Sequence, residues 1–423
     1  MQNALKKLKS IVTERSIRNR LLFVLGMIVV FRLLAIIPVP GIDAGRLSQA
    51  LASNQFLSLF NLLSGGGFAT FSIVMLGVGP FITASIIMQL LSMVIPSVKE
   101  MMQESGEAGR RTFNQYTRLL AVPIAALQAF SFIKYLQSQS VISVLPLTSL
   151  FSNILIITAG SILLMWIGEL INEYGIGNGT SIIIMAGIIA RIPTDVSQFL
   201  QSYTPDQLPT FVLFAAIGLL LIAGVVYIYE AERPIGITYA REARGMRSFG
   251  VKESYLPLRL TQAGVMPIIF ASSLLLFPQF LASIFTVAHS TKLQAVGNAI
   301  SSFLQNTALY AIVYFVLVVF FTYFYTAITF DTTQISENLQ KNGAFISGVR
   351  PGESTGKYLD SIVSRITLVG SLFLGVIAVL PLIVRASTGI TAFAIGGTSL
   401  LITVSVVIDL IRRLEAQVAL HEY

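Results

Sequence analysis

Long apolar runs without a charged residue dominate the chain and set the helices that it predicts. Five runs have 19 to 23 residues: Leu147–Ile167, Phe211–Tyr229, Ala308–Phe330, Ile366–Val384 and Ala386–Ile408. A helix of roughly 20 residues crosses the hydrocarbon core of a bilayer, so each run predicts a transmembrane helix. Two longer runs, Phe68–Ile95 and Leu260–Val287, contain prolines and predict long, tilted or broken helices.

Three shorter runs complete a set of ten predicted spans. Leu21–Ile37 is apolar except for Arg32, and Leu119–Ile133 and Gly177–Ala190 are the shortest of the ten. Composition agrees, because only 11% of the residues are charged, against roughly 25% in an average soluble domain. The predicted fold class is therefore an all-α polytopic membrane protein with ten transmembrane helices.

The placement of lysine and arginine predicts the orientation of these spans. With ten spans, 22 of the 28 basic residues fall on the face that carries both termini, five fall on the other face, and Arg32 lies within a span. Basic loops stay in the cytoplasm during insertion, so both termini are predicted to be cytoplasmic. The loop Glu169–Gly179 is an exception, because it has two acidic residues and no basic one.

The count of spans also predicts an internal symmetry. Five predicted spans precede the segment around Tyr203–Leu208 and five follow it. An odd number in each half makes the second half enter the membrane from the opposite side, as in inverted repeats, whose working site lies between the halves. We therefore expect two pseudo-symmetric five-helix halves, residues 1–203 and 204–423.

The segment between the first two spans is unusually apolar for a surface loop. Phe56–Phe68 reads FLSLFNLLSGGGF, too short to span and ending in three glycines. It predicts a short re-entrant helix closed by Gly65–Gly67, since glycine readily adopts positive φ. Such a segment must be buried in protein or line a cavity at membrane depth.

Two long cytoplasmic loops carry local structure of their own. Residues 231–260 alternate basic and apolar positions around Gly245, which predicts a projecting hairpin. Residues 331–362 begin with a short amphipathic helix that Asp331 caps and Gly343 ends. The sequence Gly348–Glu353 (GVRPGE) then predicts a rigid exposed turn.

Catalytic and cofactor chemistry is sparse in the sequence. The chain has no cysteine and two histidines, so thiolate metal sites and an HExxH zinc site are excluded. Gly352–Lys357 fails the phosphate-loop spacing, because three residues rather than four separate its glycines. No metal, cofactor or catalytic residue is predicted. The absence of acidic residues in the middle of the spans disfavours a coupled secondary transporter without excluding it. An intramembrane enzyme is also disfavoured, because the sequence shows no nucleophile with a neighbouring base.

Ordered motifs along the chain resemble the bacterial SecY family over essentially its whole length. The motifs are Ile37–Asp43, Phe60–Gly66, Ala84–Leu90, Gly106–Arg111, Gln115–Arg118, Tyr174–Gly179, Ala263–Pro267, Gly348–Glu353 and Gly396–Leu400. The resemblance implies a clamshell of two halves around an hourglass pore in the bacterial inner membrane. It also implies a passive channel that translocates unfolded preproteins and releases transmembrane segments laterally into lipid.

The resemblance assigns a ring of aliphatic side chains to the waist of the pore. By motif, the ring positions are Val78, Ile82, Thr180, Ile184, Ile269 and Ile402. An apolar constriction dewets and blocks ions, whereas branched aliphatics offer a passing chain no fixed hydrogen bond. Taken singly, each position could equally be ordinary core or face lipid, and Thr180 departs from the usual aliphatic residue.

The resemblance also implies a plug and a lateral gate. The plug is a short helix seated below the ring, and its motif positions are Phe60, Asn61, Leu62, Leu63, Ser64, Gly65 and Gly66. The gate opens between spans 2–3 and spans 7–8, with polar positions at Thr83, Gln89, Gln128 and Thr261. Thr261 stands where an asparagine is common. These polar side chains could instead hold neighbouring helices together by hydrogen bonds, without a role in gating.

Partners follow from the same resemblance. SecE would clamp the halves, SecG would be peripheral, and the ribosome or the SecA motor would dock on the basic cytoplasmic loops. The expected docking residues are Arg244, Arg247, Lys252 and Arg350. Arg350 is the residue that we expect to be essential for coupling to the motor, because Gly348 and Pro351 hold it in a stiff turn.

Overall fold

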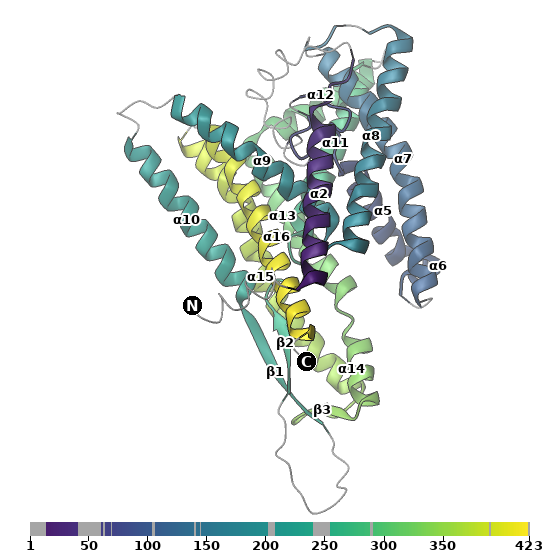
Figure 1. Cartoon of the computed structure of the whole chain (residues 1–423), viewed down its shortest axis with the longest axis vertical. Coiled ribbons are helices and arrows are strands. Elements are labelled where there is room, and N and C mark those ends of the chain that lie inside the picture. The colour runs from purple at the N-terminus through teal and green to yellow at the C-terminus, as the bar shows by residue number, and fades with distance from the viewer. Residues whose placement is uncertain are drawn as a thin grey trace, which may run out of the picture.

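The structure is a computed structural model of the 423-residue chain. It describes residues 14–40, 61, 64–68, 70–103, 106–138, 141–143, 145–201, 208–239, 254–287, 291–388 and 391–421. Helices make up most of this part, and they run mainly along the long axis of the molecule (Figure 1).

The first half of the chain contributes the helices α2 (Arg15–Ile36), α5 (Gly79–Val94), α6 (Pro96–Gln103), α7 (Gly106–Ser138), α8 (Leu147–Tyr174) and α9 (Gly179–Gln201). The second half contributes α10 (Leu208–Glu230), α11 (Met266–Val287), α12 (Thr291–Gln305), α13 (Thr307–Thr329), α14 (Thr332–Lys341), α15 (Glu353–Thr388) and α16 (Thr391–His421). The helix α2 begins and α16 ends at the end of the molecule that carries the strands (Figure 1).

Several described helices are suited to a membrane by length and composition. Five are long and apolar enough to cross one: α2, α7, α8, α13 and α15. The pair α5 and α6, which bends by 115°, adds a sixth if it forms one span, and α9, α10 and α11 contain shorter apolar helices. Helices therefore occupy the predicted spans, while the count of ten transmembrane spans stays a prediction.

The two long proline-containing runs are broken, which is one of the forms that the sequence predicted. Residues 70–78 form successive turns, and α5 begins only at Gly79 with Pro80 in its first turn. Gly77 has a φ of +59°, a left-handed value that ends the preceding turn. The second run has the same form, because Gly264 has a φ of +60° and α11 begins at Met266.

A small sheet projects from the bundle at the cytoplasmic end predicted from charge. Strands β1 (Glu232–Tyr239) and β2 (Ser254–Arg259) pair antiparallel, with Glu232 opposite Arg259. This confirms two paired strands in the predicted hairpin, while the segment around Gly245 lies outside the described residues. The sequence did not predict β3 (Ala344–Ile346), which pairs antiparallel with the other edge of β1, so that the strand order is β2-β1-β3.

The sheet rests on the N-terminal part of α15. Ile235, Leu258 and Ile346 from the three strands are buried against Leu359 and Ile362 of that helix. The amphipathic helix α14 also packs on α15. Asp331 caps α14 by accepting hydrogen bonds from the amides of Thr333 and Gln334, each at 3.0 Å. The predicted cap is therefore confirmed, and the predicted stop also holds, since Gly343 has a φ of +67° just after the helix.

Glycines bring backbones into close contact inside the first half. A Cβ atom added at Gly160 of α8 would lie 2.0 Å from the carbonyl oxygen of Ile73, far inside normal contact. Such close approach lets helices and turns pack without side chains between them.

Gly160→Ala should therefore destabilise the chain, because the new methyl group meets a backbone atom that cannot rotate away. We expect a loss of about 1–3 kcal/mol, seen as a lower melting temperature of the detergent-purified chain. Gly26→Ala is the matched control, since Gly26 also lies within a helix and an added Cβ there meets nothing within 4 Å. Equal melting temperatures for the two variants would contradict the packing described.

Candidate functional site

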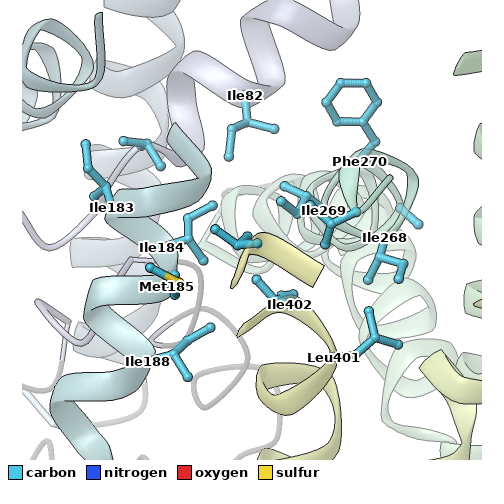
Figure 2. Close-up of a cluster of buried hydrophobic side chains, with 14 of the residues drawn as sticks. Ile82, Ile183, Ile184, Met185, Ile188, Ile268, Ile269, Phe270, Leu401 and Ile402 are labelled. Atoms are coloured by element: carbon cyan, nitrogen blue, oxygen red, sulfur yellow. The ribbon is translucent and has the colours of Figure 1, made fainter. Parts of the chain in front are cut away.

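Five of the six predicted ring residues lie in one buried apolar cluster. Val78, Ile82, Ile184, Ile269 and Ile402 are each at most 4% exposed. Figure 2 shows Ile82, Ile184, Ile269 and Ile402 gathered around a common centre, although they come from the four helices α5, α9, α11 and α16. We call these five residues, with the buried apolar side chains of the same cluster around them, the waist.

The local structure explains how these side chains reach the waist. Val78 occupies the N-cap position of α5 and Ile82 follows one turn later. Ile269 lies in the first turn of α11, directly after the turns that break the run at Gly264. The breaks therefore determine where α5 and α11 begin, and so they determine the direction of the Ile82 and Ile269 side chains.

Thr180 lies one helical turn before Ile184 on α9 and is half-buried. The helix begins at Gly179, whose amide donates to the side chain of Asn172 at 2.8 Å, while Asn178 accepts from the amide of Ser181 at 3.2 Å. These contacts fix the start of α9. The assignment of Thr180 to the ring stays a prediction.

The waist holds more apolar side chains than the sequence predicted. Ile183, Met185, Ile188, Ile268, Phe270 and Leu401 are all buried in the same cluster (Figure 2). Consecutive isoleucines at 182–184 were the available signal on α9. A helix that is apolar on every side is buried on every side, so the run pointed to burial but not to its partners.

The end of the predicted plug segment forms a tight turn. The amide of Gly66 donates to the carbonyl of Asn61 at 2.9 Å, and the hydroxyl of Ser64 donates to the same carbonyl at 3.0 Å. Gly65 and Gly66 have φ values of +70° and +85°, as predicted, whereas Gly67 is not among the positive-φ residues. Phe60, Leu62 and Leu63 lie outside the described residues.

This turn is wedged between α2 and α9. A Cβ atom added at Gly187 of α9 would lie 2.0 Å from the Cα atom of Gly65, and one added at Gly65 would lie 2.7 Å from the ring of Phe31. Arg32 of α2 donates to the carbonyl of Gly65 at 3.4 Å. Arg32 therefore has a hydrogen-bond acceptor within the bundle, and Gly187 places the turn beside Ile184 and Ile188 of the waist.

The predicted gate positions lie on elements that pack against one another. Thr83 and Gln89 lie on α5, Gln128 lies on α7, and Thr261 lies in the turn before α11. Gln128 and Thr261 are buried, and the hydroxyl of Thr83 donates to the carbonyl of Gly79 at 3.0 Å. The side-chain amide of Gln89 donates to Ser85 at 3.2 Å. Within the described residues, the amide oxygens of Gln89 and Gln128 are buried without a hydrogen-bond partner. An unmade buried hydrogen bond costs free energy, so both oxygens would gain from a rearrangement of these helices.

The predicted docking turn around Arg350 is exposed and rigid. Gly348 and Gly352 have φ values of +84° and +95°. The hydroxyl of Thr355 donates to the carbonyl of Arg350 at 2.8 Å, and the buried hydroxyl of Ser336 donates to the carbonyl of Gly352. Arg244, Arg247 and Lys252 lie outside the described residues.

A surface ion pair follows this turn at the start of α15. The ammonium of Lys357 lies 2.7 Å from the carboxylate of Glu353. This hydrogen bond and charge lower the pKa of the Glu353 carboxyl and raise the pKa of Lys357. Both groups are fully exposed, so the pair contributes little to stability.

Comparison with known proteins adds the family. A family model described as SecY matches residues 72–411. A relative from Thermus thermophilus named protein translocase subunit SecY is 41% identical over 429 residues, which cover 99% of this chain and 97% of the relative. The chain belongs to the SecY family.

Two solved structures share the SecY fold at low identity. One concerns a SecY plug domain that stabilises the closed state of its channel, and it matches with a TM-score of 0.66 at 20% identity. The other is canine Sec61 in a ribosome–channel complex, with a TM-score of 0.63 at 20% identity. Each match covers 96% of this chain and 93% of the other. The predicted fold class is confirmed, while the division into two halves at residues 203 and 204 stays a prediction.

One contact in this SecY-family chain accounts for the acidic loop that the charge analysis left as an exception. Glu169 near the end of α8 bonds to Arg118 of α7 at 2.6 Å. Arg118 belongs to the basic loop predicted on the cytoplasmic side. One of the two acidic residues therefore contacts a base that is predicted on the same side, which is consistent with the predicted orientation.

Ser336→Ala should loosen the Arg350 turn, because the hydroxyl that holds the Gly352 carbonyl is lost. A hydrogen bond contributes roughly 1 kcal/mol, so amide hydrogen exchange over residues 348–356 should accelerate about fivefold. Ser302→Ala is the matched control, since that hydroxyl bonds only within its own exposed helix, to Ala299. Unchanged exchange at the turn in Ser336→Ala would show that other contacts hold it.

Proposed function

We propose that the chain is the pore-forming subunit of a protein translocase, through which unfolded preproteins cross the membrane. The observation that carries this proposal is the waist, where aliphatic side chains from α5, α9, α11 and α16 converge in one buried cluster. The name and 41% identity of the Thermus thermophilus relative support it.

The chemistry of the waist suits a seal that opens for polypeptides. An apolar constriction expels water and so blocks ions. The five aliphatic side chains of the ring, Val78, Ile82, Ile184, Ile269 and Ile402, carry no hydrogen-bonding group, so they close around a translocating chain without holding it. Thr180 is the sixth ring position in this proposal and adds one hydroxyl. The segment Phe60–Gly66 is the plug that supports the ring when the channel is idle.

Lateral release of apolar segments is the second part of the proposal. The gate lies between α5 and α7 on one side and α11 and α13 on the other, with polar positions at Thr83, Gln89, Gln128 and Thr261. The contacts of α11 with α5 and α7 are the ones that would separate. The unpartnered amide oxygens of Gln89 and Gln128 lower the cost of that separation, because they lose no hydrogen bond by it.

The driving force comes from partners, because the proposal gives the chain no catalytic residue, cofactor or metal of its own. SecA or a translating ribosome would dock on the cytoplasmic loops through Arg244, Arg247, Lys252 and Arg350. SecE and SecG would complete the channel. The chain would lie in the bacterial inner membrane with both termini cytoplasmic, as its basic loops favour.

Polar substitution at the waist should make the resting channel leak ions. We expect Ile184→Ser combined with Ile402→Ser to raise the resting conductance of the chain in planar bilayers roughly tenfold, because the constriction becomes wettable. Ile189→Ser is the control, since Ile189 lies on the same helix but is 43% exposed. A conductance equal to that of the control would rule out these residues as the seal.

Charge reversal at Arg350 should uncouple the motor without unfolding the chain. In vesicles that contain the chain with SecE and SecA, we expect Arg350→Glu to reduce preprotein export at least about tenfold. Loss of one partner of a hydrogen-bonded charge pair at an interface typically weakens binding by at least this factor. Lys341→Glu applies the same charge change to the same loop, where its partner Glu337 is a weak surface contact, and it should export normally.

The two outcomes separate the parts of the proposal. Normal export by Arg350→Glu would remove the docking assignment and leave the channel in place. No export by the unsubstituted chain under the same conditions would overturn the channel function itself.

A further inference from the structure

The helix α12 is amphipathic and joins two membrane-crossing helices. Its sequence, TKLQAVGNAISSFLQ, has apolar residues at 293, 296, 300, 303 and 304, which share one face at the helical period. Asn298, Ser302 and Gln305 occupy the opposite face. The helix has one basic residue, Lys292, and no acidic residue. It lies at the end of the molecule opposite the strands (Figure 1).

Within the part of the chain that the structure describes, protein covers only one flank of this apolar face. The helix packs against α11, and Gly297 is buried while Ile300 and Leu304 are half-buried. The other flank is open, because Leu293, Val296 and Phe303 are 41%, 48% and 43% exposed. A helix packed fully onto protein would bury these three residues as well.

The next helix, α13, begins close to the end of α12 and also has an exposed apolar row. Only Asn306 separates the two helices, and it caps α13 by accepting from the amides of Ala308 and Leu309. The row Leu309, Ile312, Val316 and Phe320 on α13 is exposed at helical spacing. In a membrane-spanning helix, such an exposed apolar row faces lipid.

We propose that α12 lies in the extracytoplasmic interface of the bilayer, with Leu293, Val296 and Phe303 inserted among the acyl chains and Lys292 against anionic lipid phosphates. Interfacial helices of this kind bury an apolar face about 5–10 Å into the boundary between headgroups and acyl chains. The occupant of the open flank is therefore the lipid surface, continuous with the lipid around α13. The proposal needs only a membrane-spanning chain, so it does not depend on the channel function.

Tryptophan fluorescence tests this placement, because the chain has a single tryptophan, Trp166. Trp166 is 58% exposed on the membrane helix α8 and serves as the internal positive control for lipid contact. In a Trp166→Phe background, Val296→Trp and Phe303→Trp each place a probe on the open flank. Asn298→Trp, on the exposed polar face of the same helix, is the matched control.

Each full-length variant is reconstituted in vesicles of phosphatidylcholine and phosphatidylglycerol, with bromine either near the headgroup end or near the tail end of the acyl chains. For an interfacial helix, shallow bromine should quench the Val296→Trp emission by roughly half and deep bromine should quench it less. Asn298→Trp should show little quenching and a red emission. Phe303→Trp preserves an aromatic residue, so it keeps the test valid if Val296→Trp fails to fold.

Three results would overturn the proposal. A red, unquenched emission from both flank probes would mean that the flank faces water. A blue but unquenched emission would mean that protein covers it, either another part of the chain or a second copy. Stronger quenching by deep than by shallow bromine would mean that α12 is inserted as part of a span and does not lie in the interface.

Discussion

The packing of apolar side chains at the waist is the contact on which the rest of the structure depends. One buried cluster contains residues of α2, α5, α8 and α9 from the first half and of α10, α11, α13, α15 and α16 from the second. Lipid provides no hydrophobic driving force for helix association, because acyl chains are as apolar as leucine. Close van der Waals contact must therefore hold the two halves together, and aliphatic residues that interdigitate supply it. The same contacts that close the bundle are also weak enough individually to part.

Small residues determine what sits beside the waist. Gly187 lies on α9 between Ile184 and Ile188, and it lets the backbone of Gly65 approach to a distance that no side chain would allow. The turn at Gly65 is closed from the other side by Phe31 and Arg32 of α2. An arginine within a membrane span is costly unless it finds an acceptor, and for the half-buried Arg32 the Gly65 carbonyl is one. The waist and the turn are thus packed as one unit, although they derive from segments more than a hundred residues apart.

Sequence reasoning succeeded where one residue determines a local conformation. The cap at Asp331, the stop at Gly343 and the left-handed Gly65 and Gly66 all follow from such rules, and all are confirmed. The alternation of basic and apolar residues also predicted paired strands, which β1 and β2 form. It failed where a contact joins distant segments. Three residues, Ala344–Ile346, give no periodicity from which a strand could be recognised, and β3 exists because β1 offers it a free edge. The pairing of Gly65 with Gly187 has no local signature either, since a glycine in a helix predicts close packing but not its partner. Family motifs, rather than physical pattern, selected Val78, Ile82, Ile184, Ile269 and Ile402 from the many aliphatic positions in the chain.

One helix extends from the Arg350 turn to the buried cluster of the waist. α15 has 36 residues, which corresponds to about 54 Å at the rise of an α-helix. Its start follows the Arg350 turn directly, and its first part supports the sheet through Leu359 and Ile362. Leu374, Ala378 and Leu382 further along belong to the cluster that contains the waist. α15 also packs extensively on α13, which carries the proposed gate on its side of the bundle. A helix transmits displacement along its axis with little compression, so a partner docked on the Arg350 turn, as proposed, would act on an element whose later residues lie in the same buried cluster as the proposed ring. In the proposal, docking and sealing therefore share one physical element.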